Sequence, residues 1–341
     1  MTIQDILQKQ DLPYKAKVAH AELRAREFYD TIVGQMYNAN CHVSVGGLDS
    51  ITLYLFLQSI CINVPGISVS SVEDKSIQRI HKALGILTVK PLKSKAKVIQ
   101  EYGFPVISKN SAEKISSLQN INAKESRIIA IMTGKTSKRQ YSRKTKLPDK
   151  WLKLFAGHHS EIRPNLVCKI APFKVSDRCC YWLKEKPCRD WGKERNSYPY
   201  LGLMASEGGQ RELGLIKNGC NYYSKSDTRS CPFAIFTRQD ILQLAIDLKV
   251  PVPEIYGEIK RKPDGTLYTT RAQRSGCSMC GFGIHIEKRP HRFDRLKEDN
   301  PKEWAYWMYD VGWGQVLDWI GVEWEGPPGA MRGQLSLDDV M

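Results

Sequence analysis

The sequence lacks a hydrophobic run of membrane-spanning length, because no stretch reaches the ~18 consecutive apolar residues that a helical span requires. Its first residues have neither the charged region nor the apolar region of a secretory signal. The Walker A spacing G-x-x-x-x-G-K-[ST] is absent, which excludes a phosphate loop of that type. Ten cysteines in 341 residues are too few for a disulfide scaffold. These absences predict a soluble, cytoplasmic protein without a membrane partner, in which clustered cysteines bind metal.

Acidic residues are scarce relative to basic ones, since 36 Asp and Glu stand against 51 Lys and Arg, a net charge of +15. Such a surface attracts polyanions, either nucleic acid or nucleotides with several phosphates. The alternative is that the charge serves solubility alone. A chain of this length can bury a full core, so we expect one large domain, or one domain with an appendage.

The segment VSVGGLDS at 43–50 joins a short β-branched run to an apolar run with helical spacing. Gly46 and Gly47 allow a tight turn in which several backbone N–H groups converge on one anion, and the helix N-terminus adds partial positive charge. Asp49 and Ser50 are the N-cap candidates of the helix. The pattern predicts a phosphate cradle, and its alternative is a strand-to-helix turn without a ligand.

Strands that alternate with helices predict an α/β fold with a mostly parallel, twisted sheet, helices on both faces and a helical C-terminal extension. The expected strands are 41–45, 66–71, 86–89, 104–107, 127–133 and 200–205; the expected helices are 15–37, 51–61, 73–84 and two or three after 290. The expected domains are an N-terminal helical segment at 1–40, a nucleotide-binding α/β domain at 41–250, a cysteine-containing and helical region at 251–330 that completes it, and a frayed tail at 331–341.

Several polar residues stand at the predicted ends of these elements. Glu73 follows a strand at the edge of the phosphate cradle, where a carboxylate could hold Mg²⁺ or a ribose hydroxyl, or could simply favour a helix N-terminus. Thr237 and Asp240 predict a helix that begins with a capping box. The sequence PDG at 263–265 predicts a hairpin.

A basic loop is predicted between Gly134 and Lys146, where cations surround Tyr141 and apolar residues are almost missing. The loop is either a contact for a polyanion or a solvated basic loop. Its cations are Lys135, Lys138, Arg139, Arg143, Lys144 and Lys146.

Two cysteine pairs are the strongest chemical signal: Cys179 with Cys180, and Cys277 with Cys280. A C-x-x-C sequence places two thiolates on one turn, close enough to share a metal. Neighbouring side chains of a Cys-Cys pair diverge, so both reach one centre only if that centre is large or the backbone bends. A cubane is larger than a zinc ion, which favours a cluster, and the alternatives are a Zn²⁺ site or buried thiols.

The glycine turn at 43–50 resembles the PP-loop, S-G-G-x-D-S, of the ATP pyrophosphatase and phosphoadenylyl-sulfate (PAPS) reductase superfamily, whose domains are Rossmann-like and adenine nucleotide alpha-hydrolase-like. Four positions match the motif: Gly46, Gly47, Asp49 and Ser50. Val45 and Leu48 stand where the family often has Ser and Lys, and Ser44 lies next to the substituted serine.

Two further stretches are similar to segments of the same family. Glu207 and Arg211 match the E-S-x-x-R motif, in which the arginine would be a forked partner for phosphate or sulfate. The cysteine pattern resembles that of adenylyl-sulfate (APS) reductases, where four thiolates bind a [4Fe–4S] cluster, and Lys184 matches a lysine four residues beyond the Cys-Cys pair. The sequence RSGCSMCGFG at 274–283 resembles a segment of phage and bacterial PAPS-reductase-like proteins.

The resemblance covers about 43–320 and implies an enzyme that binds PAPS, APS or ATP and performs sulfur chemistry with a [4Fe–4S] cluster, with Mg²⁺ as a further cofactor. It implies catalytic roles for Asp49, Lys184 and Arg211. The residues it implies for nucleotide binding are Ser44, Gly46, Gly47, Asp49, Ser50, Glu73, Glu207 and Arg211, and the cluster ligands are Cys179, Cys180, Cys277 and Cys280.

Three reactions or roles remain open within this resemblance. A PAPS or APS reductase would use a cysteine nucleophile and a thioredoxin-like or other electron donor, but the family's E-C-G-L-H cysteine has no counterpart after Cys280. An ATP-dependent sulfur transferase would adenylylate and then thiolate DNA or tRNA, which suits the basic charge. A nucleotide- or redox-sensing module would bind without catalysis.

Overall fold

The computed structural model of the protein describes residues 3–135, 140–224 and 227–326. The chain divides into two compact units, each made of two stretches of sequence. Unit 1 consists of residues 1–92 and 183–277, and unit 2 of residues 93–182 and 278–341. The domain ranges expected from sequence have different boundaries, because they treat 41–250 as one stretch. The tail expected at 331–341 lies outside the described residues.

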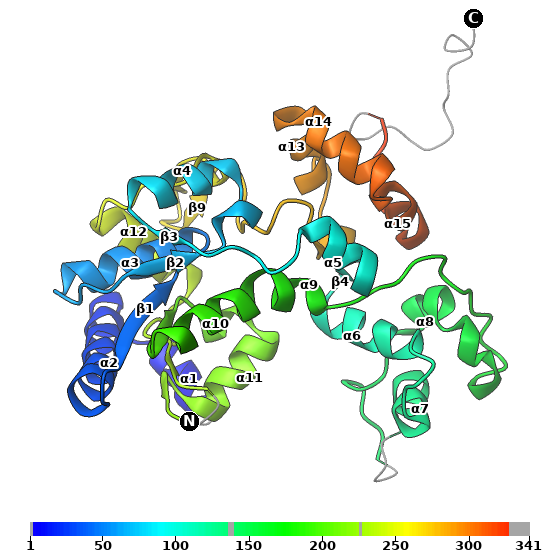
Figure 1. Cartoon of the computed structure of the whole chain (residues 1–341), viewed down its shortest axis with the longest axis horizontal. Coiled ribbons are helices and arrows are strands. Elements are labelled where there is room, and N and C mark those ends of the chain that lie inside the picture. The colour runs from blue at the N-terminus through cyan, green and yellow to red at the C-terminus, as the bar shows by residue number, and fades with distance from the viewer. Residues whose placement is uncertain (1–2, 136–139, 225–226, 327–341) are drawn as a thin grey trace, which may run out of the picture. The chain divides into compact units, whose positions relative to one another are not determined.

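Unit 1 is built on a six-stranded sheet with the strand order β3-β2-β1-β5-β7-β6 (Figure 1). All neighbouring strands are parallel except β6 and β7. The central strand β1 pairs through Val43 with Gly66 on one side and with Tyr200 on the other. The strands are β1 (Asn40–Ser44), β2 (Gly66–Ser68), β3 (Leu87–Thr88), β5 (Ser197–Leu201), β6 (Asn221–Tyr222) and β7 (Arg229–Ser230).

Helices surround this sheet, and the predicted α/β fold is therefore confirmed. The α-helices of unit 1 are α1 (Ile3–Gln10), α2 (Tyr14–Gln35), α3 (Leu48–Ser59), α4 (Lys75–Ala83), α10 (Lys186–Glu194), α11 (Gly209–Asn218) and α12 (Arg238–Asp247). Short 3₁₀ turns are η1 (Ser70–Val72), η4 (Ala205–Glu207) and η5 (Glu254–Tyr256). The predicted hairpin is present as β8 (Ile259–Arg261) and β9 (Leu267–Thr269).

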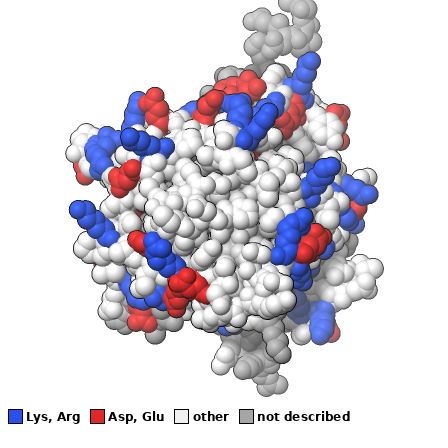
Figure 2. All heavy atoms as spheres, turned by 60° about the vertical axis from the view of Figure 1, so that its left-hand side comes forward, with Lys and Arg blue, Asp and Glu red and all other residues white. Residues whose placement is uncertain are grey.

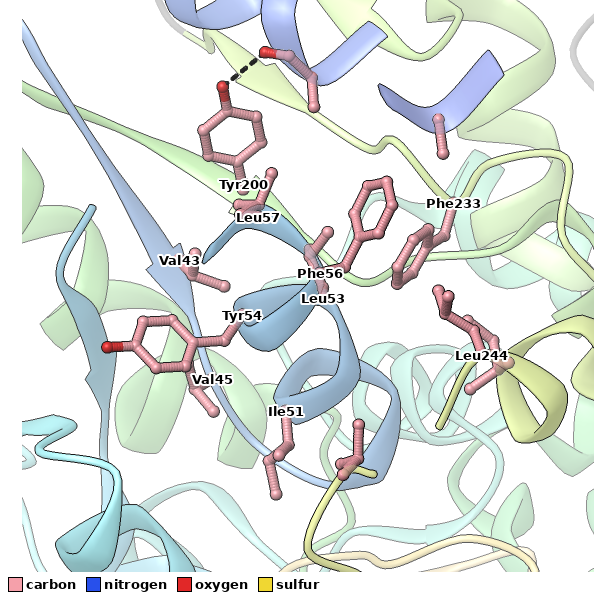
Figure 3. Close-up of a cluster of buried hydrophobic side chains, with 14 of the residues drawn as sticks. Val43, Val45, Ile51, Leu53, Tyr54, Phe56, Leu57, Tyr200, Phe233 and Leu244 are labelled. Atoms are coloured by element: carbon pink, nitrogen blue, oxygen red, sulfur yellow. Dashed lines mark hydrogen bonds between the residues drawn. The ribbon is translucent and has the colours of Figure 1, made fainter. Parts of the chain in front are cut away.

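The core of unit 1 holds β1 and α3 together. Val43, Leu53 and Leu57 are fully buried, and Tyr200 from β5 lies beside them (Figure 3). The Tyr200 hydroxyl donates a hydrogen bond of 2.7 Å to the Ala25 carbonyl of α2, so its one polar atom is satisfied inside the core. Each large apolar side chain buried here contributes about 1.5–3 kcal/mol, which fixes the start of α3 firmly at the end of β1.

Unit 2 is mainly helical and contains a dense aromatic core around Phe104, Phe293 and Trp313. Its α-helices are α5 (Lys95–Tyr102), α6 (Lys109–Leu118), α7 (Glu125–Thr133), α8 (Asp149–Phe155), α9 (Arg178–Cys180), α13 (Arg292–Asp299), α14 (Pro301–Ala305) and α15 (Trp313–Ile320). The parallel strands β4 (Val106–Ile107) and β10 (Gly281–Phe282) form a separate two-stranded sheet. The 3₁₀ turns are η2 (Gly157–Ile162) and η6 (Ile284–Ile286), and π-helical turns span η3 (Tyr181–Glu185), at the boundary of the units, and η7 (Tyr306–Asp310). No helix in the described ranges has the length and apolar character needed to cross a membrane.

Three predicted strands require correction. Residues 127–133 belong to the helix α7, because Ile128, Ile131 and Met132 are buried at helical spacing and Gly134 ends the helix in a left-handed conformation. The strand expected at 104–107 exists in part as β4, but it pairs with β10 instead of joining the main sheet. The strands expected at 41–45, 66–71 and 86–89 are present in the main sheet with shifted ends, although residues 70 and 71 belong to η1. Of the strand expected at 200–205, only residues 200 and 201 lie in a strand, the end of β5, and residue 205 begins η4. The predicted helices and the capping box of α12 are present.

Candidate functional site

The candidate site lies in unit 1, where β1 ends and α3 begins. The N-cap of α3 is Gly47, which corrects the prediction that Asp49 or Ser50 caps the helix. The Ser50 hydroxyl accepts a hydrogen bond of 2.7 Å from Gly46 N–H and donates one of 3.0 Å to the Gly47 carbonyl, so it closes the turn. Gly47 N–H and Asp49 N–H donate to no group in the described part of the chain. These two donors at a helix N-terminus are available to an anion.

This turn stands at the point where the chain's strand order reverses. The strands that follow β1 first lie on one side of it, as β2 and β3, and later lie on the other, as β5 and β7. In parallel α/β sheets, ligands bind at such a reversal, beyond the carboxyl ends of the strands. Gly202, just after β5, packs against the first turn of α3, since a Cβ there would lie 3.2 Å from the Asp49 carbonyl oxygen and from Ser50 Cα.

The second predicted motif reaches the same edge. Beyond β5, the chain passes through η4, which ends at Glu207, and then enters α11. The Glu207 side chain is only 7% exposed and forms an ion pair with the half-exposed Arg211. Both charged groups act on the pKa of Asp49, which places them near the glycine turn. Segments around residues 46–50 and 207–211 are thus brought together, as the resemblance implies.

Asp49 is surrounded by three arginines. It forms an ion pair with Nη1 of Arg238, the first residue of α12. Arg274 has its Nη2 4.0 Å from Glu207 Oε1, and Arg211 completes the set. Burial raises the pKa of Asp49, Glu207 raises it further, and the three arginines act in the opposite direction. Three cations against two carboxylates leave one positive charge in excess, as an anionic ligand requires.

The guanidinium group of Arg238 is only partly hydrogen-bonded. Its Nε and Nη2 are buried and have no hydrogen-bond partner among the described residues. Leaving such donors without a partner costs about 1–3 kcal/mol each, so a ligand oxygen that accepted their hydrogen bonds would gain that energy back.

A buried ion pair supports the turn from the other side. Glu73, with its side chain 4% exposed, forms an ion pair with Lys184, and a Cβ on Gly46 would lie 3.4 Å from Glu73 Oε1. Burial lowers the pKa of Lys184, but the charges of Cys277 and Glu73 and hydrogen bonds to both raise it well above its usual value. His81 holds the Gly46 carbonyl oxygen through Nε2 at 2.8 Å.

The first helical amide is already capped by a hydroxyl. Tyr256 accepts a hydrogen bond of 3.1 Å from Leu48 N–H, and its hydroxyl lies 2.5 Å from Ser275 Oγ. A Cβ on Gly47 would overlap both hydroxyl groups, which explains the glycine at that position. Burial raises the pKa of Tyr256, so its hydroxyl is neutral at physiological pH.

Ser44 ends β1, where it pairs with Ile67 on one side and Leu201 on the other. The residues that sequence reasoning missed are His81, Arg238 and Tyr256, whereas Arg274 and Ser275 were singled out only as part of the cysteine segment at 274–283 and not as neighbours of the glycine turn. One of them had a local signal. A cation in the first turn of a helix opposes the helix dipole, so Arg238 at the first position of α12 stands where structure alone would favour an acid. The others are recognised only by the fold.

The four cysteines are divided between the units. Cys277 belongs to unit 1, where it contacts Lys184, whereas Cys179, Cys180 and Cys280 belong to unit 2. Cys179 is buried and the other three are half-buried. In the described ranges, no group of three or more His, Cys, Asp or Glu side chains is arranged to hold a metal ion. The [4Fe–4S] and Zn²⁺ alternatives therefore remain predictions that rest on the sequence pattern.

Comparison with known proteins adds no assignment: no protein-family model matches the chain, and no curated protein is significantly similar to it. What the site can bind therefore follows from its own residues. A glycine turn, two available amides and an excess of arginine suit a phosphate-bearing ligand.

Proposed function

We propose that unit 1 binds an adenine nucleotide (PAPS, APS or ATP) with its phosphates on the glycine turn, and that the protein is a PAPS-reductase-like enzyme of sulfur chemistry. The observation that carries the proposal is the meeting of the turn, Asp49, Arg211 and Arg238 at the reversal point of a parallel sheet. A turn without a ligand would have no need for three arginines around one aspartate.

The arginines would act by electrostatic stabilisation. Arg211 and Arg238 present forked donors, which fit the paired oxygens of a phosphate or sulfate. Together with Gly47 N–H and Asp49 N–H, they would neutralise charge that develops when a bond to phosphorus or sulfur breaks. Mg²⁺ would bind at Asp49, whose carboxylate is half-buried, more readily than at Glu73, which is buried against Lys184.

The cysteine pairs would supply the sulfur and electron chemistry. We propose Cys179, Cys180, Cys277 and Cys280 as ligands of a [4Fe–4S] cluster, because four soft thiolates suit iron–sulfur binding. Lys184, which contacts the thiol of Cys277 and the carboxylate of Glu73 in unit 1, would link the charge of the thiolate to the nucleotide turn. When bound, the cluster would supply electron transfer or hold the sulfur that is transferred.

The two reactions differ in their products. A reductase releases sulfite from PAPS or APS with a thioredoxin-like donor, whereas a sulfur transferase converts ATP to AMP in the presence of its DNA or tRNA acceptor. We expect one of these two turnovers from protein purified without oxygen, together with iron and inorganic sulfide in equal amounts. Binding of a nucleotide without either turnover would favour the sensing role. A colourless protein that contains zinc would contradict the cluster.

A further inference from the structure

The net positive charge of the protein is concentrated in one stretch of unit 2. Residues 93–182 contain 19 Lys and Arg against 6 Asp and Glu, whereas the rest of the chain contains 32 against 30. The excess of +13 in 90 residues therefore accounts for nearly all of the +15 of the whole sequence. Figure 2 shows a contrasting face, on which Lys and Arg are interspersed with Asp and Glu around an uncharged centre.

Local acids do not neutralise this charge, because the main ones already have partners. Glu113 forms an ion pair with Arg127, and Asp149 binds both Lys146 and Arg163. The exposed Arg143 and Lys144 have no ion pair with any residue in the described ranges. Uncompensated cations therefore remain on the segment between α7 and α8.

Hydrogen bonds to the helices α6 and α7 hold the segment between α7 and α8 in place. Lys114 of α6 is only 6% exposed, and its ammonium group donates to the carbonyl oxygens of Lys144 at 2.6 Å and of Lys146 at 3.3 Å. Leu147 N–H donates to the Ile131 carbonyl of α7 at 2.9 Å. We name residues 140–147 the basic turn. Burying a cation such as Lys114 costs free energy, and its hydrogen bonds to two backbone carbonyls offset that cost. These bonds hold the basic turn in a conformation in which Arg143 and Lys144 are exposed to solvent.

An aromatic ring lies at the start of the basic turn. Tyr141 is 66% exposed and forms an antiparallel bridge with Lys135. Gly134 lies under its ring, because a Cβ there would be 2.6 Å from Tyr141 Cε2. Exposed Lys150 and Lys153 follow on α8. Lys138 and Arg139, which were predicted as part of this loop, lie outside the described residues.

We propose that the basic turn of unit 2 binds the backbone of a single-stranded nucleic acid. Arg143 and Lys144 would contact phosphates, and Tyr141 would stack on a base, which is the combination that single-strand binding uses. An exposed aromatic ring among cations favours a single strand over a duplex, whose bases are already stacked. The proposal goes beyond nucleotide binding in unit 1 and does not depend on it.

The experiment uses the full chain and a fluorescein-labelled single-stranded 20-mer, with binding followed by fluorescence anisotropy at several salt concentrations. Each phosphate contact contributes about 0.7 to the slope of log K against log salt for single strands, so R143A/K144A is expected to reduce the slope by about 1.4. Y141A is expected to weaken binding about fivefold or more and to leave the slope unchanged, because stacking is not ionic.

The matched control is K260A/K262A on the hairpin of unit 1, where two exposed lysines also neighbour a tyrosine, Tyr268. It is expected to bind the oligonucleotide as the parent protein does. The proposal is overturned if the parent protein does not bind the strand, or if the control loses as much affinity as R143A/K144A. It is also overturned if the parent protein binds vesicles of anionic phosphatidylserine but not the strand. Titration of ATP into R143A/K144A separates this result from the nucleotide proposal, because unit 1 is unchanged in that variant.

Discussion

At the scale of single residues, the candidate site depends on side chains that are far apart in the sequence. Arg238 and Asp49 are 189 positions apart, and Tyr256 and Leu48 are 208 apart. These residues meet because later parts of the chain return to the edge of the sheet at which β1 ends and α3 begins. Among the described residues, Nε and Nη2 of Arg238 have no hydrogen-bond partner, and the ion pair of its Nη1 with Asp49 partly offsets the cost of burying them.

Replacement of Arg238 tests the anion site directly. R238Q removes the charge and the fork, so we expect the affinity for ATP, measured by isothermal titration calorimetry, to fall about tenfold or more, because charge-assisted hydrogen bonds contribute about 1.5–3 kcal/mol. The control K260Q removes an exposed cation from the hairpin of the same unit and is expected to leave the affinity unchanged. Equal affinities for R238Q and the parent protein would exclude Arg238 from the site.

Buried His42 predicts a loss of stability in acid. Burial lowers its pKa from 6.5 to about 4, so between these values the unfolded state binds a proton that the folded state does not. The contribution of neutral His42 to the free energy of unfolding is therefore fully present above pH 6.5 and falls by about 1.4 kcal/mol per pH unit below it, about 3 kcal/mol in total. Urea unfolding at pH 7 and pH 4.5 should show this loss in the parent protein.

The variant H42Q should show a smaller difference between the two pH values, because it lacks the titrating ring. The control H158Q, at an exposed position, should retain the difference of the parent protein. If H42Q and the parent protein lose the same free energy of unfolding, His42 is not the source of the acid sensitivity.

At the scale of elements, the sequence predicts structure best where a local signal specifies it. The capping box of Thr237 and Asp240, the turn at 263–265 and the helix 15–37 are confirmed because short-range chemistry defines them. The helix α7 was predicted as a strand because a run of isoleucines suits both structures, and only the burial of Ile128, Ile131 and Met132 shows the helical period. The pairing of β4 with β10 depends on residues 175 positions away and has no local signal.

The glycine turn is the element on which the site depends, and Gly47 tests it. In G47A the new Cβ must displace the hydroxyl groups of Tyr256 and Ser275, which breaks the hydrogen bond to Leu48 N–H. We expect a loss of about 1–3 kcal/mol in the free energy of unfolding, measured with urea, together with loss of nucleotide binding.

Two further variants separate a specific clash from a general effect of alanine. The cost of G47A should be smaller in a Y256F background, because the closest hydroxyl is then missing. G34A, next to the last residue of α2 and with no heavy atom of the described residues within 4 Å of the new Cβ, should be neutral or stabilising by less than about 1 kcal/mol. An undiminished cost in the Y256F background would show that the clash is elsewhere.

At the scale of the whole molecule, the chain builds two units, and its positive charge is distributed unevenly along the sequence. Unit 1 contains the six-stranded sheet and the candidate site, and the 93–182 stretch of unit 2 holds the excess of positive charge. The sequence predicts the α/β class, which is confirmed, because alternating strands and helices can be recognised from residue patterns along the chain. The glycine turn likewise predicts the edge of the sheet at which we propose that a ligand binds. It does not show that the chain leaves unit 1 after residue 92 and returns at 183, because no linker of distinct composition marks either crossing.

Calorimetric titration of the full chain with ATP, PAPS and APS tests the central claim most directly, when repeated in the presence of pyrophosphate. We predict one site per chain, competition by pyrophosphate, loss of binding in G47A, an affinity about tenfold or more weaker in R238Q, and unchanged binding in G34A. If the folded parent protein binds none of the three nucleotides, or if G47A and R238Q bind them as tightly as the parent, the glycine turn of unit 1 is not a phosphate site.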